Sequence, residues 1–218
     1  MKTAIVIGAT GLVGKALIQQ LLASAHVSKV VVLARRSTGV IDPKLKEHII
    51  AFDLLELWQD LVEGDVLFSA LGTTLKQAGG KEAQYRIDYI YQYEVAAAAA
   101  RNGVPQYVLV SSAGANPQSR VFYSRMKGGL EEAVKKLSFR SIYLLQPSLL
   151  VGARPEERMG EKIGYRMLKG LNAIGVLKKY RPIEDKMVAH AMVQAALAAA
   201  SGLHVYTLNE LFALAIEG

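Results

Sequence analysis

The sequence contains no cysteine among its 218 residues. This absence excludes disulfide bonds, thiolate catalysis and cysteine-ligated metal sites. The histidines do not recur at the spacing of a metal site either, so we expect no metal; they are His26, His48, His190 and His204. The lack of cysteine is compatible with the cytoplasm, which is the location that we expect for this protein.

Long hydrophobic runs are also missing, although 51% of the residues are hydrophobic. The segment Val95–Ala100 reads as a small-residue helix face, far below the ~20 residues that a membrane span needs. Lys2 and the apolar residues after it could begin a secretory signal, but the run breaks at Gly8 and no cleavage-type site follows. We therefore expect neither secretion nor a membrane partner.

Positive charge is concentrated in the second half of the chain. Residues 1–110 carry 11 Lys/Arg and 10 Asp/Glu, whereas residues 111–218 carry 15 and 9. Within the basic segment 154–181, four cations repeat at helical spacing on one face: Arg158, Lys162, Arg166 and Lys169. This face is either solvated or part of a lid that recruits an anionic substrate. Because no recognised nucleic-acid motif and no aromatic stacking platform accompanies it, we expect no nucleic-acid partner.

Short apolar runs alternate with helical patterns along the chain. The runs predict strands at 3–7, 29–34, 48–52, 65–70, 106–112 and 139–146, with a last strand at 204–208 before a small helix. The helical patterns lie at 12–25, 54–61, 82–102, 121–137, 157–171 and 184–200. This alternation predicts an α/β fold with a doubly wound parallel sheet. We expect a single domain over residues 1–218, with 152–183 as a small C-terminal cap.

A glycine loop directly follows the first apolar run. Ala4-Ile5-Val6-Ile7 leads into Gly8-Ala9-Thr10-Gly11-Leu12-Val13-Gly14, and a helical pattern follows. In such a loop Gly8 permits the tight turn, Gly11 lets the backbone approach a diphosphate, and Gly14 lets the helix pack on the strand. The alternative is an ordinary strand–helix turn. The second strand, about twenty residues on, favours a dinucleotide site.

The second predicted strand ends in Arg35 and Arg36, where a sheet that prefers NAD usually offers a carboxylate. A guanidinium there can pair with the 2′-phosphate of NADP(H), so we expect NADP(H) rather than NAD(H). The alternative is that both arginines are solvated. Asp53, after the third predicted strand, could bond the adenine amine, cap the following helix, or do both.

Tyr123 and Lys127 stand at positions i and i+4 of a predicted helix, roughly 5–6 Å apart at Cβ. A lysine ammonium beside a phenol favours the phenolate, so such a tyrosine can give a proton to a carbonyl oxygen or take one from an alcohol. Ser111 or Ser112, at the end of the preceding strand, would polarise the same oxygen. The alternative is a surface tyrosine near a lysine. The Ser-Ser-Ala-Gly turn before the helix favours the catalytic interpretation.

These motifs together resemble the short-chain dehydrogenase/reductase superfamily. The resemblance is carried by Gly8…Gly11…Gly14, Asp53-Leu54, Leu71-Gly72-Thr73-Thr74, Ser111-Ser112-x-Gly114, Tyr123-x-x-x-Lys127 and Gln146-Pro147. The short length, the Leu-Gly-Thr-Thr segment and the Tyr-x-x-x-Lys-Gly sequence look closest to the atypical branch that contains the Tat-interacting-protein oxidoreductases. The NmrA-like and sugar-epimerase branches look more distant.

The resemblance implies a Rossmann fold that binds NADP(H), with Ser112, Tyr123 and Lys127 as a catalytic triad. It also implies cofactor contacts from the loops at the strand ends, namely Gly8, Thr10, Gly11, Leu12, Val13, Arg35, Arg36, Asp53, Leu54, Ala70, Leu71, Gly72, Ser111, Tyr123, Lys127, Pro147 and Leu149. The chain departs from the superfamily pattern in one respect. The helix-four asparagine that often completes the proton relay is absent, and Asp88 lies nearby.

Three functions stay open on the sequence alone. The chain is an NADP(H)-dependent oxidoreductase for an unknown carbonyl or alcohol, an epimerase that uses the same chemistry transiently, or a non-catalytic NADP(H)-responsive regulator of a protein partner. The tyrosine–lysine pair favours catalysis. The missing asparagine and the small substrate region favour the regulator.

Two predicted helices are candidates for a homodimer interface. Tyr85, Tyr89 and Tyr93 form a stripe along 82–102 that is too apolar to leave in water. In the superfamily that the chain resembles, the helices equivalent to 82–102 and 121–137 often pair across a two-fold axis. The alternative is that the stripe packs on the chain's own sheet or under the cap.

Overall fold

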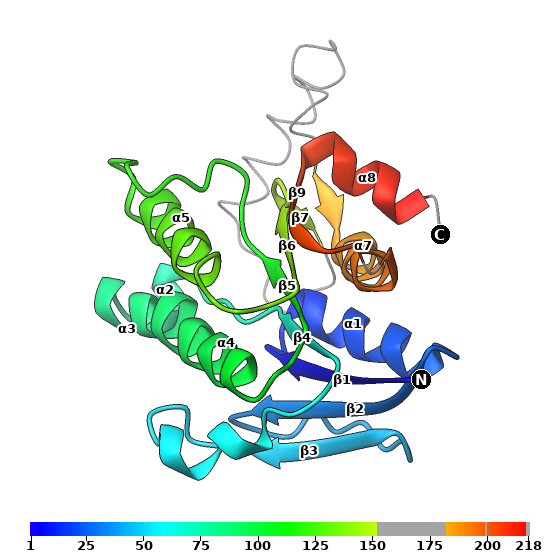
Figure 1. Cartoon of the computed structure of the whole chain (residues 1–218). Helices are drawn as coiled ribbons and strands as arrows, with labels where there is room; N and C mark the ends of the chain where they lie inside the picture. The colour runs from blue at the N-terminus through cyan, green and yellow to red at the C-terminus, as the bar shows by residue number, and fades with distance from the viewer. Residues whose placement is uncertain (152–181, 199, 217–218) are drawn as a thin grey trace.

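A seven-stranded, all-parallel sheet forms the centre of the molecule. The computed structural model describes residues 1–151, 182–198 and 200–216. The strand order is β3-β2-β1-β4-β5-β6-β9 (Figure 1). The strands are β1 (Lys2–Ile7), β2 (Val27–Ala34), β3 (Leu45–Ile49), β4 (Val66–Ser69), β5 (Gln106–Val110), β6 (Ser141–Gln146) and β9 (Gly202–Thr207). β1 therefore lies inside the sheet, between β2 and β4.

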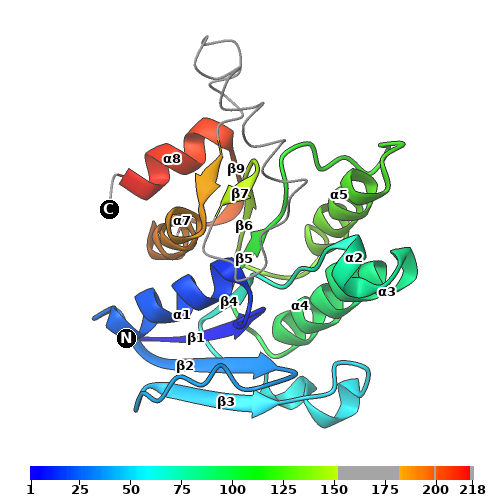
Figure 2. The same cartoon turned by 180° about the vertical axis from the view of Figure 1, so that it is seen from behind.

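Helices cover both faces of this sheet, as the two opposite views show (Figures 1 and 2). One face is covered by α1 (Leu12–Ala23), α7 (Asp185–Ala198) and α8 (Leu208–Ile216), and the other by α4 (Gln92–Arg101) and α5 (Phe122–Val134). The shorter elements are η1 (Leu55–Leu57), η2 (Gln59–Leu61), α2 (Leu75–Ala78), α3 (Lys81–Tyr85), η3 (Arg86–Tyr91), β7 (Leu150–Val151) and β8 (Ile183–Glu184). The predicted doubly wound α/β fold is confirmed.

Alternate residues of the first strand explain why it reads as one continuous apolar run. Ala4 and Val6 belong to the core under α1 and α7, whereas Ile5 and Ile7 belong to the core under α4 and α5. All four are fully buried. A strand covered on both faces needs an apolar side chain at every position, which is the pattern of a parallel sheet.

The third strand and the helix after it differ from the prediction. The predicted strand 48–52 lies instead at Leu45–Ile49, in register with Val30–Ala34 of β2. Phe52 leaves the sheet because its ring is buried against Tyr91, with ring centroids 5.2 Å apart. The predicted helix 54–61 is two short 3₁₀ turns, η1 and η2.

The predicted helix 82–102 is three segments in sequence: α3, the π-helical η3 and α4. Side chains tie this π-helical stretch to the end of β4. Gln92 Nε2 donates to the Asp88 carbonyl oxygen at 2.7 Å, and Ser69 Oγ donates to Gln92 Oε1 at 2.7 Å. π-Helical turns are rare and are often found at functional sites.

Several predictions concern residues outside the described ranges. They are the helix 157–171, the basic segment 154–181 and most of the cap 152–183. Within the described ranges, no helix has the length and apolar character to cross a bilayer. Those ranges also hold no group of three or more His, Asp or Glu side chains placed to bind a metal ion.

Candidate functional site

The glycine loop lies between the end of β1 and the start of α1. Gly8 has a φ of +81°, and a Cβ there would come within 2.3 Å of the backbone of Ala70 and Leu71. A Cβ on Gly14 would come within 2.1 Å of the Gly8 carbonyl oxygen. α1 begins after Gly11 with no side-chain cap and no acidic residue in its first turn. The first backbone N–H groups of α1 can therefore donate hydrogen bonds to an anion.

Gly8 and Ala70 meet where the order of the strands in the sheet changes direction. β1 has β2 on one side and β4 on the other. In open parallel sheets, ligands bind at the carboxyl ends of the strands at such a point. Ala70 and Leu71 are partly buried there, and Gly72 is exposed. A Cβ at position 8 or 14 would collide with backbone atoms, so this close packing requires glycine at both positions. The uncapped N–H groups at the start of α1 fit the diphosphate of a dinucleotide.

Arg35 and Arg36 follow β2 at this same edge. Both are exposed, and neither forms an ion pair with a described residue. The loop after β2 has no acidic residue before Asp42. The two guanidinium groups are thus free to pair with an anionic group at the edge of the sheet.

Asp53 does not cap the helix that follows it, which corrects one of its two predicted roles. Its Oδ1 accepts from Arg86 Nη1 at 3.0 Å, and its Oδ2 accepts from Tyr91 Oη at 2.8 Å. The N-cap of η1 is Leu54, which makes no side-chain capping bond. The hydrogen bond from Tyr91, followed by that from Arg86, holds the pKa of the Asp53 carboxyl below its usual range. A contact from Asp53 to adenine stays a prediction.

Tyr123 and Lys127 lie one turn apart on α5 in different surroundings. Tyr123 is 39% exposed and its hydroxyl bonds to no described residue, whereas Lys127 is 3% exposed. Lys127 Nζ donates to the Val110 carbonyl oxygen at 3.3 Å, its one hydrogen bond within the described ranges. An ammonium has three donors, so about two are left for a ligand. Burying a cation with so few partners is costly, and a ligand that accepts those bonds would offset the cost.

Hydrogen bonding separates the two candidate serines. Ser111 is buried, and its hydroxyl donates to the Glu131 carboxylate. Ser112 is partly buried, and its hydroxyl makes only a long bond of 3.4 Å to the Ala113 carbonyl oxygen. The Ser112 hydroxyl can therefore turn toward a substrate, whereas that of Ser111 is already engaged.

Glu131 is a buried carboxylate that the sequence motifs above do not include. Besides the bond from Ser111, it accepts two from Gln146 Nε2, at 2.9 and 3.0 Å. These bonds join α5 to the carboxyl ends of β5 and β6. A signal for this residue was present in the sequence, because Tyr123, Lys127 and Glu131 recur every four residues and so share one helix face.

The loop after Ser112 packs directly on α5. A Cβ on Gly128 would come within 2.4–2.5 Å of the backbone of Asn116 and Pro117. The Asn116 backbone N–H also donates to the Ser124 carbonyl oxygen at 3.0 Å. The structure thus brings the loop that begins with the two serines against the helix that carries Tyr123 and Lys127.

Asp88 lies in the π-helical segment and is 1% exposed. Its Oδ1 accepts the Thr73 backbone N–H at 2.7 Å, which holds the loop after β4. Burial raises the pKa of the Asp88 carboxyl, and the positive charge of Lys127 opposes that rise. Asp88 therefore connects the loop that contains Gly72 with the surroundings of Lys127.

The remaining predicted cofactor contacts have mixed surroundings. Pro147 is buried, and its carbonyl oxygen accepts the Ala113 N–H at 2.8 Å, which joins the loops after β5 and β6. Leu54 and Leu149 are exposed, and Thr10 and Leu12 are partly buried. The Val13 side chain belongs to the core, so only its backbone could meet a ligand.

Known proteins have sequences similar to this chain over most of its length. Residues 8–140 match a family described as NAD(P)H-binding. "Protein fmp52, mitochondrial" of Emericella nidulans is 33% identical over 210 residues, which cover 93% of this chain and 90% of the relative. The protein of the same name from Candida glabrata is 37% identical over 205 residues, which cover 90% and 85%.

Solved structures share the fold at much lower identity. A short-chain dehydrogenase/reductase superfamily protein from Agrobacterium tumefaciens with bound NAD has a TM-score of 0.70 at 13% identity, covering 94% of this chain and 77% of that one. The UDP-glucose 4-epimerase of Thermotoga maritima with UDP-glucose has a TM-score of 0.68 at 15% identity, covering 99% and 82%. At these identities the likeness establishes the fold alone.

The predicted cytoplasmic location is wrong by this comparison. The relatives that match more than nine tenths of the chain are named as mitochondrial proteins. The expectation rested on the absence of cysteine, which fits any compartment that keeps thiols reduced and so does not single out the cytoplasm.

The family match and the geometry agree on the kind of ligand. The match spans more than half of the chain and includes the glycine loop, both arginines and the helix with Tyr123 and Lys127. The start of α1 next to the glycine loop has no side-chain cap and no acidic residue, so its N–H groups can bind a diphosphate. The chain belongs to the NAD(P)H-binding family.

Proposed function

We propose that this protein is an NADP(H)-dependent oxidoreductase that interconverts a carbonyl compound and its alcohol. The observation that carries the proposal is the buried Lys127 ammonium, with a single hydrogen bond in the described ranges, one turn from the exposed Tyr123. A buried lysine with unused donors, one turn from an exposed phenol, is a pairing suited to acid–base work.

Reduction of a carbonyl needs a hydride at carbon and a proton at oxygen. The nicotinamide, when bound, supplies the hydride. Tyr123 gives its hydroxyl proton to the carbonyl oxygen, and the Lys127 charge stabilises the phenolate that is left. The Ser112 hydroxyl donates a hydrogen bond to the same oxygen and stabilises the negative charge that develops there. Oxidation of the alcohol reverses these transfers.

The preference for NADP(H) is supported by Arg35 and Arg36. Replacing both with Ala should weaken NADPH binding by roughly 10–100-fold, because charge-assisted bonds to a phosphate are lost. NADH affinity should hardly change, because NADH has no 2′-phosphate. Calorimetric titration of wild type and variant with both cofactors measures the difference.

A matched control removes the same charge elsewhere. Lys29 and Arg140 are exposed and far from the carboxyl edge of the sheet, since Lys29 lies early in β2 and Arg140 directly precedes β6. Replacing these two with Ala should leave the ratio of NADPH to NADH affinity as in wild type. Equal NADPH and NADH affinities in the wild-type protein would show that Arg35 and Arg36 are only surface residues.

The same experiments distinguish the oxidoreductase from two other functions. The relatives' names state no activity, so a regulator that binds NADP(H) without turnover is the second candidate. An epimerase would use the same Tyr123 and Lys127 but would release its product without net change in the cofactor. The substrate itself is proposed to be a small molecule, and an anionic one if the basic segment 154–181 takes part in binding.

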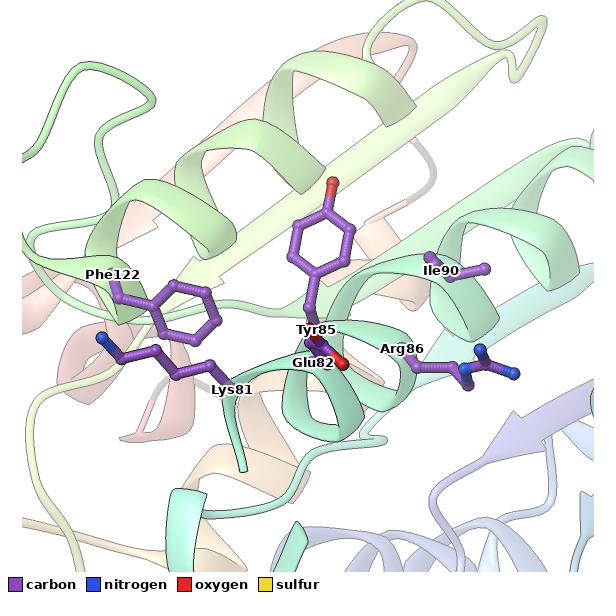
Figure 3. Close-up of a pocket in the computed structure, with 6 residues that line it drawn as sticks. All are labelled: Lys81, Glu82, Tyr85, Arg86, Ile90 and Phe122. Carbon is purple, nitrogen blue, oxygen red and sulfur yellow. The ribbon is translucent and has the colours of Figure 1, made fainter. Parts of the chain in front are cut away.

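The tyrosine stripe proposed for a homodimer is partly internal. Tyr85 and Tyr89 stack with ring centroids 4.8 Å apart, and Tyr89 and Tyr93 with 6.4 Å. Tyr89 and Tyr93 pack against the core under α4 and α5, whereas Tyr85 is 38% exposed. A surface pocket of about 390 Å³ surrounds Tyr85, and Figure 3 shows its ring between Phe122 and Lys81 on one side and Ile90 and Arg86 on the other.

We propose that this face, formed by α3, η3 and the start of α5, pairs with a second copy of the chain. Tyr85→Glu should then convert a species of twice 23.7 kDa into one of 23.7 kDa in light scattering, since a charge would be buried at the interface. Leu57→Glu is the control, because Leu57 is exposed on η1 and does not line this pocket. A wild-type mass of 23.7 kDa at micromolar concentration would refute the dimer.

A further inference from the structure

The connection between β2 and β3 contains a tether next to the proposed 2′-phosphate site. This loop, residues 35–44, begins with Arg35 and Arg36. The Glu47 carboxylate on β3 accepts from Ser37 Oγ at 2.6 Å, from the Thr38 backbone N–H at 2.9 Å, and from Thr38 Oγ1. All three donors belong to the two residues that directly follow Arg36.

Each of the two hydroxyl groups that donate to Glu47 also accepts a hydrogen bond from the backbone of the loop. Ser37 Oγ also accepts the Gly39 N–H at 3.0 Å, and Thr38 Oγ1 accepts the Val40 N–H at 3.2 Å. Burial acts to raise the pKa of the Glu47 carboxyl, but the hydrogen bonds from Ser37 and Thr38 outweigh it and leave this pKa below its usual range. Glu47 is therefore ionised at neutral pH, and the chain after Arg36 is fixed to β3.

We infer that Glu47 is a positioning residue for the 2′-phosphate of NADP(H), acting through the backbone that carries Arg35 and Arg36. The inference rests on the proposed preference for NADP(H). Both arginines are exposed and make no ion pair with a described residue, so their own side chains do not hold the loop. A loop that is ordered before binding loses less conformational freedom when the ligand arrives.

The negative charge of Glu47 by itself would weaken NADPH binding, whereas the tether would strengthen it. A carboxylate near a phosphate repels it, so removing the charge alone would tighten NADPH binding. Removing the tether would weaken NADPH binding instead. The sign of the change therefore separates a positioning residue from a nearby negative charge.

Calorimetric titration with NADPH and NADH provides the test. Glu47→Ala should weaken NADPH binding roughly three- to tenfold and leave NADH affinity unchanged. Glu47→Gln keeps one acceptor oxygen and should lose less NADPH affinity than Glu47→Ala. Glu56→Gln, which removes an exposed carboxylate on η1, controls for charge and should match wild type. In the background of Arg35→Ala/Arg36→Ala, Glu47→Ala should have no further effect.

Three results would overturn the inference: tighter NADPH binding by Glu47→Ala, an equal loss for NADPH and NADH, or a loss that persists without the arginines. If Glu47→Ala does not fold, Ser37→Ala combined with Thr38→Val removes the hydroxyl bonds from the loop side and should give the same selective loss. An unchanged ratio of NADPH to NADH affinity in the Arg35→Ala/Arg36→Ala variant would have a different meaning. It would refute the NADP(H) preference itself, and the role of Glu47 with it.

Discussion

Replacing Gly14 with Ala should abolish NADPH binding and strongly destabilise the protein. The new Cβ would lie 2.1 Å from the Gly8 carbonyl oxygen and 2.9 Å from the Ala9 Cα. These are backbone atoms, so no side chain can rotate away, and the start of α1 would have to move off β1. Overpacking of this kind costs about 3 kcal/mol or more. In a chain of this size that loss lowers Tm by roughly 6–12 °C.

Gly80→Ala is the matched control, because a Cβ at Gly80 would meet no atom within 4 Å. Thermal unfolding and calorimetric titration with NADPH should be measured on both variants. Gly80→Ala should keep the wild-type Tm and NADPH affinity. The same result for Gly14→Ala would show that the close approach of α1 to the glycine loop is not required.

Replacing Tyr123 with Phe should lower NADPH-dependent turnover by about 100-fold or more, because the proton donor to the carbonyl oxygen is removed. NADPH affinity and Tm should stay near wild type. Tyr123 is 39% exposed and its hydroxyl bonds to no described residue, so the change leaves no buried polar group unpaired. Steady-state rates and a parallel NADPH titration measure both effects. Turnover that survives Tyr123→Phe would remove the catalytic assignment.

The two serines supply an internal control for this assignment. Ser112→Ala should reduce kcat with little change in Tm, because its hydroxyl has only a long bond within the described ranges. Ser111→Ala should mainly reduce stability, by about 1–3 kcal/mol, because the buried Glu131 carboxylate loses a donor. A larger loss of kcat in Ser111→Ala than in Ser112→Ala would reverse the two roles.

The sheet and the glycine loop could be predicted because each depends on local sequence. Alternation of buried strands and helices is visible in the order of apolar runs, and Gly8 and Gly14 are needed wherever backbone atoms approach so closely. The third strand begins and ends three residues before the predicted 48–52. The apolar residues after His48 read as strand, but Phe52 is buried in the core through its stack with Tyr91, a contact between distant segments.

The polar interior of the site could not be predicted from local patterns. Glu131 and Asp88 are buried only because the ends of neighbouring strands and loops supply their hydrogen-bond donors. Asp53 fits a helix-capping pattern, yet its oxygens accept hydrogen bonds from Arg86 and Tyr91, which are 33 and 38 residues away along the chain. In each case the partner comes from another part of the chain, which a single-sequence pattern does not contain.

We propose that this chain transfers hydride between NADP(H) and a carbonyl–alcohol pair. The most direct test follows NADPH absorbance with the wild-type protein and a broad panel of aldehydes, ketones, quinones and enones. The panel is run at an NADPH concentration shown by calorimetry to saturate the site. We predict that NADPH is oxidised with at least one carbonyl compound, with one equivalent of reduced product formed. Saturated NADPH binding with no oxidation across the panel would contradict the oxidoreductase assignment and favour the regulator.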